Sequence, residues 1–153
     1  MREDDDFLRL DLQVCFPLYA ASNLFSRLYR PVLAKLGLTY PQYLVMLVLW
    51  EQAPQSVGTL GERLHLDSGT LTPLLKRMAA AGLVTRQRDA TDERRVLVGL
   101  TEQGEALRDA ARDVPLTLVS GLALSPGDLT ELRATVQHLV GVLAAAEATI
   151  AAS

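Results

Sequence analysis

The sequence has little of several residue types on which large classes of protein depend. It contains a single cysteine, Cys15, so no disulfide can form within one chain. The two histidines, His65 and His138, stand far apart and far from that cysteine, which excludes a zinc finger built on neighbouring Cys and His ligands. Aromatic residues make up only 5%. These shortages exclude a secreted disulfide-stapled fold, and we expect neither a metal nor another cofactor.

Long hydrophobic runs and a basic leader are also missing. No unbroken apolar run approaches the roughly 18 residues that a membrane span needs, and the longest extends from Tyr43 to Trp50. The N-terminus reads Met-Arg-Glu-Asp-Asp-Asp, which is the opposite of a basic signal-peptide start. We therefore expect a cytoplasmic protein without a membrane partner.

What is present is the composition of a globular chain. Its 153 residues suffice for one core, since 49% of them are hydrophobic and 22% are charged. The formal net charge is −3, but residues 63–95 carry seven basic side chains against four acidic ones, whereas residues 1–11 and 101–153 are acidic. A basic segment on an acidic chain can bind a polyanion, because screening confines its field to about 10 Å at ordinary salt. A solvated basic face explains the charge equally well.

Hydrophobic spacing predicts long helices at both ends of the chain. Over residues 7–36 apolar side chains recur every three or four positions, with a bend expected at Pro17 and an end at Gly37. The run Ser125-Pro126-Gly127-Asp128 is a strong helix start. The helix after it repeats apolar residues in steps of three and four, namely Leu129, Leu132, Val136, Leu139, Leu143, Ala146 and Ile150. A terminal helix with so long a stripe favours packing against a partner, so we expect a dimer.

The middle of the chain predicts a pair of short helices followed by a pair of strands. We expect first a buried helix over 41–52, then a short helix capped by Ser56, and then a second short helix that is capped by Asp67 or Ser68 and ends at Gly82. Two strands follow, over 83–88 and 94–100, on either side of a loop at 89–93. Thr101 is expected to cap the next helix, which breaks at Pro115. Pro73 costs nothing if its helix starts near Thr70, but removes a hydrogen bond if it starts at Ser68. This order is a winged helix-turn-helix, mainly α with a small β-hairpin (α+β), between long N- and C-terminal dimerisation helices.

The second short helix of this motif has the size and polarity to enter the DNA major groove. Its outward polar residues are Ser68, Thr70, Thr72, Lys76 and Arg77. Gly69 lets the start of the helix approach a phosphate closely. Arg94 and Arg95 at the hairpin tip can reach the adjacent minor groove, where Asp92 could hold the Arg94 guanidinium in a bidentate pair. A helical hairpin that touches no nucleic acid is the alternative, because helix-turn-helix spacing alone is a weak signal.

The stretches Leu66–Met78, Gly82–Arg86 and Asp92–Arg95, with the exit Leu100–Gly104, resemble the MarR family of bacterial transcription regulators. The resemblance covers almost the whole chain. It implies a single domain over residues 1–153, in which 1–40 and 101–153 are dimerisation helices and 41–100 form the winged lobe. It also implies a homodimer on a near-palindromic double-stranded operator, with lobes about 34 Å apart. Arg86, which closes the second stretch, joins the predicted DNA-binding residues.

Two interpretations of the lone Cys15 are open. Its sequence neighbours are apolar, which favours an inert buried side chain. Phenols, however, can stabilise a thiolate by donating hydrogen bonds to it. Tyr19 lies four residues away on the same helical face, whereas Tyr29 lies about 21 Å away along a straight helix. Tyr29 can therefore reach only the partner's Cys15, in an antiparallel dimer, and Tyr40 beyond the next turn would travel with it.

This constellation resembles one MarR subclass, the organic-hydroperoxide-resistance repressors called OhrR. Cys15 matches their reactive cysteine, and Tyr29 and Tyr40 match the tyrosines that hydrogen-bond it; the stretches Tyr40–Tyr43 and Asp67–Pro73 are shared as well. The resemblance implies that an organic hydroperoxide oxidises Cys15 to a sulfenic acid and that the operator is then released. Without a second cysteine the chain resembles the one-cysteine type, in which a low-molecular-weight thiol caps the sulfenic acid, a backbone nitrogen condenses with it, or oxidation continues.

Two other functions compete with peroxide sensing. A small aromatic ligand could release the DNA without any oxidation, as in other MarR relatives. A thiol peroxidase would need a base beside Cys15 and a means of resetting the sulfur, and the sequence offers neither a nearby basic residue nor a resolving cysteine. We therefore expect a regulator and not an enzyme.

Overall fold

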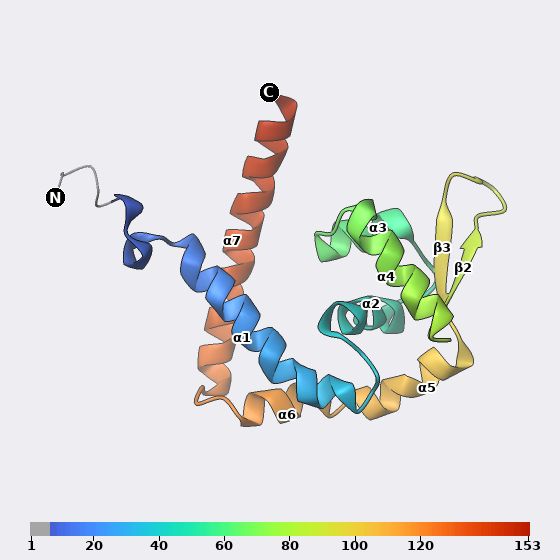
Figure 1. Ribbon diagram of the computed structural model, residues 1–153, viewed down its shortest axis with the longest axis horizontal. Coiled ribbons are helices and arrows are strands. Elements are labelled where there is room, and N and C mark those ends of the chain that lie inside the picture. The colour runs from blue at the N-terminus through green and yellow to red at the C-terminus, as the bar shows by residue number, and fades with distance from the viewer. Residues whose placement is uncertain (1–6) are drawn as a thin grey trace. The chain divides into compact units, whose positions relative to one another are not determined.

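The computed structural model describes residues 7–153 and is mainly helical with one small sheet, which confirms the expected fold class (Figure 1). Two compact units make up the chain. The first ends at Leu118 and holds the winged helix-turn-helix, and the second comprises Val119–Ser153.

Helix α1 spans Cys15–Ala34 and follows a 3-10 turn over Leu10–Leu12. The predicted helical start at residue 7 is therefore wrong. Because the helix begins at Cys15, Pro17 falls in its first turn, where a missing N–H costs no hydrogen bond and forces no break. Gly37 has a φ of 68°, the left-handed conformation that ends a helix, as predicted.

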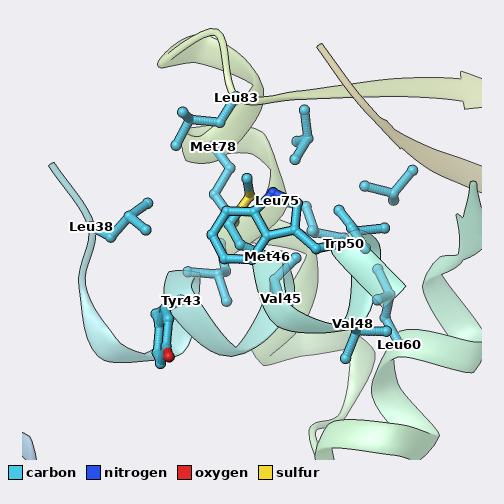
Figure 2. Close-up of a cluster of buried hydrophobic side chains, with 14 of the residues drawn as sticks. Leu38, Tyr43, Val45, Met46, Val48, Trp50, Leu60, Leu75, Met78 and Leu83 are labelled. Atoms are coloured by element: carbon cyan, nitrogen blue, oxygen red, sulfur yellow. The ribbon is translucent and has the colours of Figure 1, made fainter. Parts of the chain in front are cut away.

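Helix α2 spans Tyr40–Glu51 and lies in the middle of the core. Thr39 caps it reciprocally: the Thr39 hydroxyl accepts from the Gln42 N–H at 3.5 Å, and the Gln42 side chain accepts from the Thr39 N–H at 3.0 Å. The helix is buried on nearly every side, as its apolar sequence predicts. Figure 2 shows its side chains among those of the neighbouring helices.

Helices α3 (Val57–Leu64) and α4 (Ser68–Ala80) form the helix-turn-helix. Ser56 caps α3, and Asp67 caps α4 by accepting from the Thr70 N–H at 2.7 Å. Since α4 starts at Ser68, Pro73 lies inside it and removes one backbone hydrogen bond. The buried face of α4 consists of Leu71, Leu74, Leu75 and Met78.

The wing is a three-stranded antiparallel sheet with the order β1-β3-β2. Strands β2 (Val84–Arg88) and β3 (Val96–Leu100) form the predicted hairpin, with Arg88 opposite Val96 next to the tip. Strand β1 (Gln55–Ser56) was not predicted, because two residues are too short to show an alternating pattern. It ties the start of α3 to the sheet by pairing with β3.

Helices α5 (Glu102–Ala111) and α6 (Val114–Ser120) follow the sheet, and the break before Pro115 agrees with the prediction. The close junction at the start of α5 explains the Leu-Thr-x-x-Gly pattern. Thr101 Oγ1 donates to the carbonyl of Gly82 at 2.6 Å and accepts from the Gly104 N–H at 3.0 Å. A Cβ atom on Gly104 would overlap with the carbonyl oxygen of Leu83. The Gly104 carbonyl in turn accepts from Trp50 Nε1 at 3.0 Å, which joins α5 to α2.

Helix α7 (Pro126–Ala152) starts at the predicted cap, where Ser125 and Asp128 cap it reciprocally. Within the described residues it is the one helix that is long and apolar enough to cross a membrane by length and composition. Its exposed apolar residues include Leu132, Val136 and Leu143, which follow the heptad spacing of helices that pack on a partner helix.

We predict that Gly104→Ala lowers the free energy of unfolding by about 1–3 kcal/mol, because the new methyl group must displace the Leu83 carbonyl. Urea unfolding followed by the fluorescence of Trp50, the single tryptophan, measures this change. Gly58→Ala in α3 is the matched control, since the nearest atom to its Cβ lies 3.8 Å away. Equal midpoints for the two variants would contradict the close junction.

Candidate DNA interface and redox site

The outer face of α4 carries the predicted major-groove residues. Ser68, Gly69 and Thr70 are exposed in its first turn, and Lys76 and Arg77 are exposed near its end. Ser68, Thr72 and Lys76 follow one another at four-residue spacing and so form one stripe. The helix thus presents polar and basic groups on the side opposite its buried leucines.

A basic cavity of about 440 Å³ lies between α4 and the wing. It brings together four of the predicted DNA-binding residues, Thr72, Arg86, Arg94 and Arg95, with the start of α3. Arg86 Nε is buried and finds no acceptor among the residues that the structure describes. A buried donor without an acceptor, in a cavity lined by three guanidinium groups, is suited to an anion such as a phosphate.

Asp92 organises the outer part of the wing, but not in the predicted way. Its Oδ1 accepts from Arg94 Nε at 3.2 Å and from the Arg94 backbone N–H at 3.1 Å. The expected bidentate pair is therefore wrong, because both donors reach the same carboxylate oxygen. Arg94 keeps 93% of its side chain exposed, so its guanidinium is available for a groove.

Asp89 organises the start of the loop at the wing tip, and it was not predicted from the sequence. It accepts from the Thr91 N–H at 2.9 Å and from the Thr91 hydroxyl at 2.8 Å, and it pairs with Arg95 Nη1 at 3.3 Å. The hydrogen bonds from Thr91 and, to a lesser extent, the charge of Arg95 lower the pKa of Asp89. The run Asp89-Ala90-Thr91 is the signal that could have revealed it, since an Asp side chain often bonds the backbone two residues on.

Cys15 is the first residue of α1 and is exposed. The interpretation that it is an inert buried side chain is therefore wrong for a single chain. Tyr19, one turn further along α1, is also exposed at 68%. Because α1 is unbroken between Cys15 and Tyr29, these two residues stay about 21 Å apart within one subunit.

The other three tyrosines form a compact cluster at the opposite end of α1. The ring centroids of Tyr29 and Tyr40 lie 4.7 Å apart, and Tyr43 lies 5.9 Å from Tyr29 and 6.4 Å from Tyr40. The structure thus brings the predicted pair Tyr29 and Tyr40 together, across the α1–α2 junction. Tyr43 was not predicted as a site residue, although its spacing of three from Tyr40 on one helix would have indicated it.

All three phenols are held in the protonated form. Burial, reinforced by the neighbouring Tyr40 and Tyr43, raises the pKa of Tyr29 to about 12. Burial also raises the pKa of Tyr40, and burial together with Tyr40 raises that of Tyr43. Their hydroxyl groups have no hydrogen-bond acceptor within residues 7–153. The cluster therefore offers O–H donors that a thiolate from another chain could accept.

Comparisons of this chain with family models and with known proteins all find transcriptional regulators. Residues 27–110 match the family model described as transcriptional regulator SarA/Rot. The organic hydroperoxide resistance transcriptional regulator of Bacillus subtilis (strain 168) is 46% identical over 143 residues, which cover 94% of this chain and 97% of that protein. The HTH-type transcriptional regulator TtmR of Methylorubrum extorquens (strain PA1) is 49% identical, over 90% of this chain and 69% of its own length.

Among solved structures, that of reduced AbfR bound to DNA superimposes with a TM-score of 0.79 at 36% identity. The match covers 92% of this chain and 96% of AbfR. The fold, the motifs and these relatives identify a DNA-binding transcriptional regulator. The chain belongs to the MarR family of winged-helix regulators, in the group of the organic hydroperoxide resistance repressors, and with its single cysteine it is of their one-cysteine type.

Proposed function

We propose that this protein is a dimeric repressor that senses organic hydroperoxides through oxidation of Cys15 and then releases its operator. One observation carries the proposal: the exposed thiol and the tyrosine cluster lie at opposite ends of one rigid helix, about 21 Å apart. An antiparallel pair of α1 helices would place each thiol beside the cluster of the other subunit. The relatives' roles in organic hydroperoxide resistance and DNA binding support this assignment.

The exposed apolar surface of α1 supports the dimer. Leu24, Phe25 and Leu28 leave 37–54% of their surface in solvent on the segment between Cys15 and Tyr29. A contiguous apolar face of this kind is typical of a subunit interface. A second copy would cover it, as it would cover the heptad stripe of α7.

The sensing step uses the peroxide as oxidant. The Cys15 thiolate attacks the terminal oxygen of the hydroperoxide, an S–O bond forms, and the O–O bond breaks. The sulfur loses two electrons and becomes a sulfenic acid, while the departing alkoxide takes a proton from water and leaves as the alcohol. A low-molecular-weight thiol then replaces the hydroxyl, giving a mixed disulfide and water. Donation from the partner's Tyr29 and the partner's Tyr40 stabilises the starting thiolate.

Release follows from where the adduct would lie. A polar or charged group attached to Cys15 at an apolar interface costs free energy unless the interface rearranges. Rearrangement of the α1 pair changes the separation of the two winged lobes, which must match two half-sites about one helical turn, or 34 Å, apart. Oxidation at the interface is thereby converted into a loss of operator affinity.

We predict that Cys15→Ser binds the operator as tightly as the wild type and stays bound when cumene hydroperoxide and a small thiol are added. The wild-type protein dissociates under the same conditions, and a gel shift measures both. Tyr29→Phe, which removes only the hydroxyl, is expected to bind DNA normally and to react more slowly with the peroxide.

Release of Cys15→Ser by the peroxide would rule out sensing at this sulfur. Release of the wild type by salicylate-like compounds without oxidant would instead favour a ligand-controlled regulator. Sustained consumption of peroxide, rather than one turnover per subunit, would indicate a thiol peroxidase.

We predict that Arg94→Ala weakens operator binding about 10–100-fold, because the exposed guanidinium at the wing tip is lost. The dependence of affinity on salt should also become shallower. Lys35→Ala, which removes one exposed positive charge at the end of α1, is the control. Equal weakening by the two substitutions would show that net charge, and not the wing, determines affinity.

A further inference from the structure

A second cavity, of about 250 Å³, opens next to the tyrosine cluster. Tyr43 lines this cavity and also packs against Tyr29 and Tyr40 with its ring tilted. The remaining walls come from α2 and from the region where α5 passes into α6, namely Leu47, Trp50, Glu51, Arg108, Ala111, Arg112 and Pro115. Its interior is apolar, and the exposed charged side chains at its rim are Glu51, Arg108 and Arg112, of which Arg112 pairs with Asp109 at 3.2 Å.

The segment before α1 is a preformed apolar surface. Gln13 Nε2 donates to the carbonyls of Phe7 at 2.5 Å and Arg9 at 3.3 Å, which folds the segment back on itself. Arg9 and Asp11 form an ion pair at 2.7 Å on the polar side. The apolar side chains are 59–83% exposed and comprise Phe7, Leu8, Leu10, Leu12 and Val14. An ordered turn that exposes so much apolar surface indicates a binding partner.

We propose that residues 7–14 of one subunit dock into the Tyr43 cavity of the partner. The proposal rests on the proposed dimer and extends it, because it assigns an occupant to a cavity that lies outside the thiol site itself. Each subunit would contribute one N-terminal segment and receive one.

Chain geometry supports this occupant. Leu12 precedes Cys15 by three residues, so their Cα atoms can be at most about 10 Å apart. The Tyr43 ring lies within 6.4 Å of the Tyr29 and Tyr40 rings. A thiol that reaches the partner's Tyr29 and the partner's Tyr40 therefore brings Leu12 to within reach of the cavity on the other side of that cluster.

The charge of the segment does not oppose docking. Residues 7–14 carry one basic and one acidic side chain, Arg9 and Asp11, which pair with each other and leave the segment neutral. The apolar side chains would fill the apolar interior, while the Arg9–Asp11 pair stays on the polar side of the segment. Docking would also fix the start of α1, so a bulky adduct on Cys15 would have to displace the segment.

Disulfide trapping tests the contact directly. The Cys15→Ser background contains no other thiol, so Leu12→Cys on one chain and Leu47→Cys on another leave one cysteine each. After the two chains are refolded together and mildly oxidised, we expect roughly tenfold more covalent heterodimer than from random collision, since docking supplies a local concentration near the millimolar range. Gln87→Cys on the exposed face of β2 replaces Leu47→Cys in the control pair.

Sedimentation of the same samples separates the possible failures. A dimer that gives no more cross-link than the Gln87→Cys control overturns the docking and leaves the proposed function intact. A monomer overturns both. Because a substitution could disturb docking, the wild-type dimer is also titrated with decanoate while Trp50 fluorescence is monitored. Saturable quenching would show that the cavity is open to a small anion, which also overturns the proposal.

Discussion

The unbroken length of α1 is the constraint on which the proposed redox chemistry depends. Cys15 begins this helix, and Tyr29 lies fourteen residues later with no break between them. A helix rises about 1.5 Å per residue, so the thiol of one subunit cannot meet the Tyr29 and Tyr40 phenols of the same subunit. Any site that combines them must be built from two chains. In the proposed dimer such a site would exist only while the two subunits keep one geometry, so a chemical change at one atom would alter the arrangement of whole lobes.

Helix α2 is the element through which such a change can spread in the first unit. It carries Tyr40 and Tyr43 at its start, and Trp50 near its end donates to Gly104 at 3.0 Å. Gly104 lies against the carbonyl of Leu83, directly before strand β2 of the wing, where even a methyl group cannot be accommodated. Closely packed elements transmit a displacement instead of absorbing it. The tyrosines and the wing are thus connected through one buried helix.

Much of this arrangement was predictable because it depends on local chemistry. The caps at Ser56, Thr101 and Ser125, and the left-handed Gly37, follow from short-range rules that tertiary packing did not override. The features that the sequence did not predict depend on contacts between elements that are distant in the chain. Strand β1 exists only because β3 lies beside it, and Tyr43 matters only because α1 places Tyr29 next to it.

The wing shows the same division between local and spatial information. The sequence pattern indicated that Asp92 holds Arg94, but it could not show whether the Asp92 carboxylate uses one oxygen or two. In the folded wing both Arg94 donors reach the same oxygen, Oδ1. The burial of Arg86 Nε without an acceptor could not be read from an alternating strand, because it depends on the distance between α4 and the sheet.

A comparison of free energies favours a switch that needs only one modified subunit. A hundredfold loss of operator affinity corresponds to about 2.7 kcal/mol. Leaving one polar group buried without a hydrogen bond costs about 1–3 kcal/mol by mutational measurement, and a charged adduct costs more. A single adduct at an apolar interface can therefore supply most of the free energy that release requires. Because each thiol would face the other subunit in the proposed dimer, both lobes would respond to that one event, and a second oxidation would add little.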